Sequence, residues 1–157
     1  MPNWIEGTLK LRGDREHIKK FFLEGLELSS WFGEESRIED QVIDQSDNEY
    51  DYLCFEFVGE PYIAGTRRAF ITGDYAEMSG DYGTCCVNVK QAWRFSQDVN
   101  IWEEIAKTYD VDLKLYGIEC GTEVVEEVII IRGHRPIVNH IGYGDWMWEC
   151  PFPCMGG

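Results

Sequence analysis

Hydrophobic and polar residues alternate over residues 4–12, which predicts a strand with one buried and one exposed face. Gly13-Asp14 follows and predicts a turn and a helix N-cap, because the Asp14 carboxylate can accept hydrogen bonds from the free amides of the next turn. The helix is predicted by one apolar stripe of helical period, formed by Ile18, Phe21, Phe22 and Leu26. The chain is therefore expected to begin with a β-α unit.

The same patterns predict four further strands and a second helix. Strand-forming residues are dense over 52–58 and 84–93, and two later strands are predicted over 111–118 and 124–132. Asp98 is placed to cap the second helix, whose buried stripe consists of Trp102, Ile105, Ala106 and Tyr109. The predicted order of elements is β-α-β-β-α-β-β.

This order limits how the two helices can bury their stripes. A split β-α-β arrangement places both helices on one face of an antiparallel sheet. We therefore predict an α+β fold, a ferredoxin-like sandwich over residues 1–133, whose other sheet face stays open for a partner. Residues 34–51 are expected to be an acidic insertion, 59–83 turns and a surface loop, and 134–157 an irregular tail rich in Gly, Pro and aromatic residues.

Length and composition place the chain among single-domain proteins with an ample core. Its 157 residues are 44% hydrophobic, and it carries 14 basic against 29 acidic residues, a net charge of −15. So large a negative charge argues against direct nucleic-acid binding, which depends on clustered cations. The sequence contains no transmembrane segment and no secretion signal, so a cytoplasmic protein, inside a host cell, is expected.

The negative charge is concentrated in residues 34–60, which contain ten acids and one base. Such a run is typical of a solvated surface that confers solubility, and the alternative is a surface that binds a basic partner. Because like charges repel and this segment lacks hydrophobic periodicity, we expect it to be exposed. The candidate partner-binding residues are Glu34, Glu35, Glu39, Asp40, Asp44, Asp47, Glu49 and Asp51.

No catalytic motif is present. The chain lacks a nucleophile elbow, a phosphate-binding loop and a dinucleotide-binding glycine loop, so neither catalytic residues nor a cofactor are predicted. The six cysteines are expected to be reduced thiols. Cys85 and Cys86 are adjacent on a predicted strand, where successive side chains face opposite ways, so one of them should be accessible.

The tail permits three interpretations. His134, His140, Cys150 and Cys154 are of types that ligate zinc, although their spacing is not one of the common zinc patterns. The tail aromatics can instead dock by packing, or become ordered on a partner. We favour docking by packing and predict no metal.

Several short stretches resemble the YubB-like ferredoxin-fold family of plasmid and bacteriophage proteins. The opening Met1-Pro2-Asn3-Trp4 and the first strand ending at Gly13 are similar to the start of that family. Tyr82-Gly83-Thr84-Cys85-Cys86 lies where the family has Trp-Gly-Thr-Lys-Trp, and Gln91-Ala92-Trp93 lies where it has Thr-Ala-Trp. The resemblance implies a ferredoxin-like fold and an origin on a mobile element, and it implies no reaction.

Two functional hypotheses follow. The first is a non-enzymatic phage or plasmid protein that inhibits a host defence nuclease, as anti-CRISPR proteins do, by presenting an acidic surface that mimics nucleic acid. Its partner would be a basic host protein that handles nucleic acid, with no contact to a membrane. The alternative is a small nucleotide-binding or nucleotide-sequestering protein or enzyme that uses Arg67-Arg68 and the Tyr82–Thr84 region.

Overall fold

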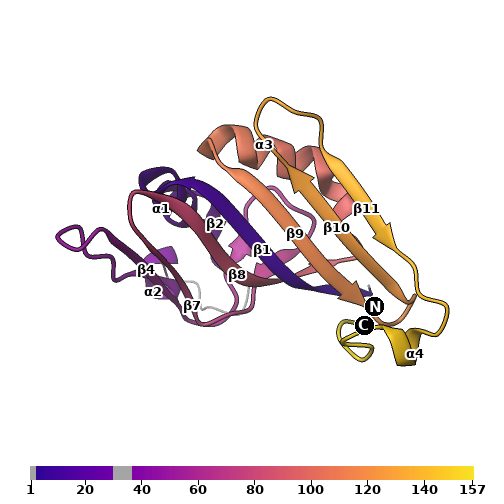
Figure 1. Cartoon of the computed structure of the whole chain (residues 1–157). Coiled ribbons are helices and arrows are strands. Elements are labelled where there is room, and N and C mark those ends of the chain that lie inside the picture. Colours follow the sequence, from indigo (N-terminus) through magenta and orange to yellow (C-terminus); the bar gives the residue numbers. More distant parts are fainter. Residues whose placement is uncertain (1–2, 30–36) are drawn as a thin grey trace.

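The computed structural model describes residues 3–29 and 37–157 and is built mainly from antiparallel sheet (Figure 1). The larger sheet has eight strands among these residues, in the order β11-β10-β9-β1-β8-β6-β5-β2. Its strands are β1 (Trp4–Asp14), β2 (Leu26–Glu27), β5 (Tyr62–Ile63), β6 (Ala69–Ile71), β8 (Tyr82–Ala92), β9 (Asp112–Glu119), β10 (Val124–Ile130) and β11 (Ile137–Ile141). The smaller sheet has the order β3-β4-β7, with β3 (Val42–Asp44), β4 (Tyr52–Phe57) and β7 (Tyr75–Ser79).

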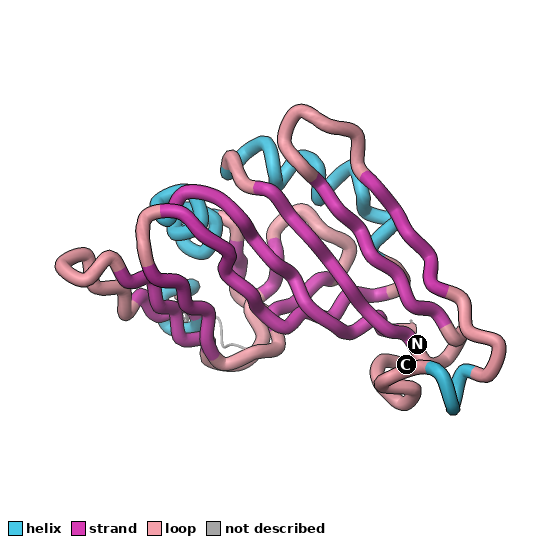
Figure 2. Tube along the Cα trace, viewed as in Figure 1, coloured by secondary structure: helices cyan, strands magenta, loops and turns pink. Residues whose placement is uncertain are grey.

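The described residues also contain four short α-helices and one 3-10 helix. They are α1 (Arg15–Glu24), α2 (Ile38–Gln41), η1 (Phe95–Asp98), α3 (Val99–Tyr109) and α4 (Trp146–Glu149). Figure 1 and Figure 2 show α1 and α3 behind the strands of the larger sheet. Of the described helices, only α4 lies on the viewer's side, at the lower end of the sheet. None of the helices in the described ranges is long and apolar enough to cross a bilayer.

The main core lies between the two longer helices and the larger sheet. Leu9 and Leu11 on β1 are fully buried, and they belong to one cluster with Phe21 of α1 and Trp102 of α3. The Trp102 indole nitrogen donates to the side-chain oxygen of Gln91 at 3.2 Å, so even its polar atom is satisfied inside the core. The apolar stripes seen in the sequence therefore form the buried faces of both helices, except that Leu26, expected in the first helix, lies beyond it in β2.

The smaller sheet joins this core through α1. The Phe22 ring lies 5.1 Å from the ring centre of Phe55 and 5.6 Å from that of Phe57, both on β4. Alternation along β4 then directs Tyr52 and Glu56 to the opposite, outer face of the smaller sheet. One helix thus connects the two sheets, and the outer face of the smaller sheet points away from it.

The predicted ferredoxin-like two-helix sandwich is wrong. The segment 59–83 was expected to form turns and a surface loop, but it contains β5, β6 and β7. These strands bury apolar side chains such as Ile71 and Met78, which a surface loop would leave exposed. The tail, expected to be irregular, contains β11 and α4. Short strands that pair with distant partners therefore extend the sheet to eight strands and build a second sheet beside it.

The acidic insertion also has more structure than its composition indicates. It contains α2 and β3, and both Gln41 and Val42 are buried. The Gln41 side chain accepts a hydrogen bond from the Ser29 backbone amide and donates one to the Ser29 hydroxyl, each at 3.1 Å. These bonds explain how a polar residue can anchor this segment inside the protein.

Candidate functional site

Carboxylates gather on the smaller sheet and the turns around it. Residues 37–60 and 74–81 contain eleven acids and a single base, Arg37. We call this set the acidic surface. Its members are Glu39, Asp40, Asp44, Asp47, Glu49, Asp51, Glu56, Glu60, Asp74, Glu77 and Asp81. The smaller sheet, α2 and the segments that connect them therefore carry most of the net charge of the chain.

The predicted partner-binding residues that the structure describes are all exposed, as expected, although the same segment was expected to be exposed throughout and its Gln41 and Val42 are buried. They are Glu39, Asp40, Asp44, Asp47, Glu49 and Asp51, whereas Glu34 and Glu35 lie outside the described residues. Whether they bind a partner stays a prediction.

Four of these acids also have local structural contacts. Asp44 forms an ion pair with Lys19 at 2.9 Å, and Asp51 forms one with Arg15 at 3.0 Å. Asp40 accepts from the Arg37 backbone amide at 2.8 Å, and the Asp47 carboxylate accepts from the backbone amide of Glu49 at 2.9 Å. Partial burial opposes ionisation of Asp44, but hydrogen bonds from Ser46 and Lys19 outweigh it and lower the pKa of that carboxyl.

Three carboxylates of the acidic surface are free of such contacts. The side chains of Glu39, Glu49 and Asp74 form no hydrogen bond or ion pair with any residue the structure describes, and all three are exposed. No residue in the described ranges therefore uses their charges to hold the fold. They are the members of the surface best placed to contact another molecule.

Exposed tyrosines lie among the carboxylates. Tyr50 is 74% exposed and Tyr75 is 56% exposed, and Tyr75 lies directly opposite Glu56 in the β4–β7 pairing. The Tyr52 hydroxyl donates to the Glu77 carboxylate at 2.7 Å, and this bond raises the pKa of Tyr52 above its ordinary value. Sequence reasoning missed these tyrosines, because their association with the acids depends on strand register.

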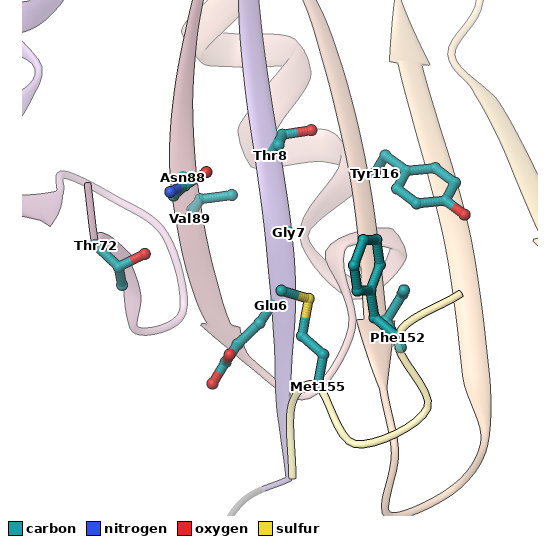
Figure 3. Close-up of a pocket in the computed structure, with 10 residues that line it drawn as sticks. Glu6, Gly7, Thr8, Thr72, Asn88, Val89, Tyr116, Phe152 and Met155 are labelled. Atoms are coloured by element: carbon teal, nitrogen blue, oxygen red, sulfur yellow. The ribbon is translucent and has the colours of Figure 1, made fainter. Parts of the chain in front are cut away.

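The open face of the larger sheet contains a groove of about 330 Å³ (Figure 3). Its floor is formed by polar side chains of adjacent strands, including Thr8 of β1 and Asn88 of β8. Phe152 and Met155 reach over the strands from the C-terminal tail and form its apolar side (Figure 3). The tail therefore shapes this face.

Packing holds the tail in place. Trp146 and Cys150 are buried in a small cluster with Ile118 and Val125 at one end of the open face. The Trp146 indole nitrogen donates to the Pro153 carbonyl at 2.9 Å. Trp148, by contrast, is 86% exposed. The expected docking by packing is thus observed for one tail aromatic, while another remains at the surface.

The candidate zinc ligands are not brought together. Among residues 3–29 and 37–157, no group of three or more His, Cys, Asp or Glu side chains could hold a metal ion. His140 lies 3.6 Å from the buried carboxylate of Glu126, and the His134 ring contacts the backbone carbonyl of Arg132. Cys150 is buried and Cys154 is exposed.

The alternative nucleotide site is divided between the two ends of one strand. The backbone carbonyl of Arg68 accepts from Ala92 at the end of β8, whereas Tyr82 begins β8 and lies opposite Asp14. At about 3.3 Å per residue these groups are roughly 30 Å apart. Arg67 contacts Asp98, and the Arg68 guanidinium lies 5.7 Å from the centre of the Trp4 ring. The two arginines and the Tyr82–Thr84 turn therefore do not form one site.

The adjacent cysteines face opposite ways, as the strand pattern predicts. Cys85 is buried and Cys86 is exposed, so the expected accessible thiol is confirmed. Burial raises the pKa of the Cys85 thiol to about 12. At neutral pH Cys85 is a protonated core side chain, which is unsuited to nucleophilic chemistry.

No family model, no curated protein and no solved structure matches this chain. The resemblance to the YubB-like family therefore stays a prediction.

Proposed function

We propose that this protein acts by binding a basic protein partner through the acidic surface. The observation that carries the proposal is the combination, on and around one small sheet, of eleven carboxylates with exposed Tyr50 and Tyr75. Surplus charge increases the rate of encounter with a partner of opposite sign. Tyrosine adds contact area at little cost in side-chain entropy, and it is enriched in interfaces.

A protein that binds nucleic acid is the partner class that suits this surface. Its binding groove presents clustered lysines and arginines, which carboxylates at the surface of another protein can occupy. Free Glu39, Glu49 and Asp74 are available for such pairs, because no described residue uses their side chains. In its specific form the proposal is inhibition of a host defence nuclease by competition with its nucleic acid.

The test removes the free charges and leaves the local contacts intact. Glu39→Gln, Glu49→Gln and Asp74→Asn are combined in one variant, and Glu24→Gln, Glu104→Gln and Glu123→Gln form a control of equal net charge. Each protein is used to capture partners from a lysate of the host cell. The captured nucleic-acid-binding protein is then assayed for competition between this chain and its own DNA or RNA.

We expect the first variant to lose capture and competition, and the control to keep both. Competition should also weaken between about 50 and 500 mM salt, because the screening length falls severalfold. Equal capture by the variant, the control and the unchanged protein would contradict the proposal, as would competition that is indifferent to salt. Melting curves of all three proteins check that each is folded.

A further inference from the structure

We propose that a second groove, on the open face of the larger sheet, binds a small organic anion with an apolar body. This cationic groove has a volume of about 490 Å³, within the range of small-molecule sites, which is about 300–1,000 Å³. Its side chains come from β1, β8, β9 and β10 and from the residue that follows β10. Those that the argument uses are Lys10, Arg12, Thr84, Lys114, Ile129 and Ile131.

The first observation is a pair of like charges. Lys10 of β1 and Lys114 of β9 are directly opposite each other in the antiparallel pairing, and both are exposed. Like charges at directly opposite positions destabilise a sheet. The Lys114 ammonium is compensated by the Glu127 carboxylate at 2.6 Å. Lys10 forms no ion pair with any residue in the described part of the chain, so one cation is left uncompensated in this groove.

The second observation is that the neighbouring charges are held in place. The Arg12 guanidinium donates twice to one oxygen of Asp112, at 2.8 and 3.1 Å, and Arg132 donates to the other oxygen of that carboxylate. Both oxygens of the Asp112 carboxylate are therefore occupied by arginine donors, so Asp112 does not neutralise Lys10. Thr84 lies directly opposite Arg12 in the β1–β8 pairing, is exposed and carries a hydroxyl donor. An anion entering the groove meets donors that need little rearrangement.

The third observation sets the chemistry of the rest of the ligand. Ile129 is directly opposite Lys114, and both Ile129 and Ile131 line the groove while remaining partly exposed. An apolar group placed against them would remove hydrophobic surface from water. The groove is thus suited to a phosphate or carboxylate attached to a ring or short hydrocarbon chain. In a chain of net charge −15, such a site needs a local cationic cluster to attract any anion.

The test is a titration of ¹⁵N-labelled protein followed by amide chemical shifts. The probes are phenyl phosphate, inorganic phosphate and the neutral ring compound benzyl alcohol. We expect phenyl phosphate to bind more tightly than either of the others and to shift the amides of Lys10, Thr84, Lys114 and Ile129. Lys10→Gln should weaken its binding about tenfold, which corresponds to about 1.4 kcal/mol, because it removes the uncompensated cation that would bind the anion.

Lys20→Gln is the matched control, because Lys20 is an exposed lysine of α1, on the helix-covered side of the sheet. It should bind phenyl phosphate with unchanged affinity. Shifts absent up to about 10 mM probe, a range that detects millimolar affinity, would overturn the proposal. Equal weakening by both substitutions, or binding unaffected by Lys10→Gln, would also overturn it. The result is independent of the acidic surface, so the two proposals can fail separately.

Discussion

The two sheets differ in how their charges are compensated. On the open face of the larger sheet, Arg12 pairs with Asp112 and Lys114 pairs with Glu127, so most charges there have an opposite partner in the fold. The acidic surface has eleven carboxylates and one arginine of its own, and four of these carboxylates form ion pairs with described cations of α1 and β8, so the larger part of its charge has no partner among the described residues. The comparison separates charge that holds the structure together from charge that is left for an external partner.

The largest effect is expected where the two sheets share a side chain. Phe22→Ala should lower the free energy of unfolding by about 3–5 kcal/mol, because it removes a buried ring packed against Phe55 and Phe57. Leu23→Ala is the control, since Leu23 is the next residue of α1 and is 47% exposed. It should change stability by less than about 0.5 kcal/mol. Urea unfolding measures both, and similar losses in the two variants would contradict a shared core.

An intermediate effect is expected at the ion-paired carboxylate of the larger sheet. Burial opposes ionisation of Asp112, but bonds from the Arg132 amide and the Arg12 and Arg132 side chains lower its pKa below the ordinary value. Asp112→Asn should therefore cost about 1–3 kcal/mol at neutral pH. A lowered folded-state pKa gives stability that is fully present above the unfolded value of about 3.9 and is lost as the pH falls through the folded value.

Urea unfolding of the unchanged protein and Asp112→Asn at pH 7 and near pH 3 tests this sign. The difference between the two proteins should shrink at the lower pH. Asp74→Asn provides the comparison from the smaller sheet, because the exposed Asp74 side chain has no bond to a described residue. It should show no difference at either pH. If the difference in unfolding free energy between the unchanged protein and Asp112→Asn were the same at both pH values, the lowered pKa of Asp112 would be contradicted.

The smallest effect concerns repulsion within the acidic surface. Raising the salt concentration from about 50 to 500 mM screens repulsion between exposed charges, so it should raise the melting temperature of the unchanged protein slightly. The melting temperature of the combined Glu39→Gln, Glu49→Gln and Asp74→Asn variant should rise less with salt. The control with Glu24, Glu104 and Glu123 neutralised should respond to salt more nearly as the unchanged protein does. Identical responses of all three would show that the surface charges do not repel measurably.

Local periodicity explains the parts of the fold that the sequence could predict. The helix expected after Asp14 is α1, and its stripe residues Ile18, Phe21 and Phe22 are all buried. The second helix is α3, with Trp102 buried at its centre. These positions are recognisable because residues three and four apart share a helix face, whatever the rest of the chain does.

Pairing between distant segments explains what the sequence could not show. β6 has three residues and is defined by its pairing with β8, while every residue of β11 is exposed, so neither carries a recognisable alternation. The acidic residues of the candidate site were visible from composition alone. The opposition of Lys10 and Lys114 was not, because it depends on the register between β1 and β9.

The exposure of β11 has a consequence for how the molecule moves. Among the described strands β11 pairs only with β10, and none of its five residues is buried. Local opening is easiest where few apolar contacts must be broken, so the amides of Ile137–Ile141 should exchange with solvent sooner than those of β1. The buried Trp146 just beyond it keeps the following segment attached. β11 can therefore open as a loop fixed at both ends, while the rest of the sheet stays closed.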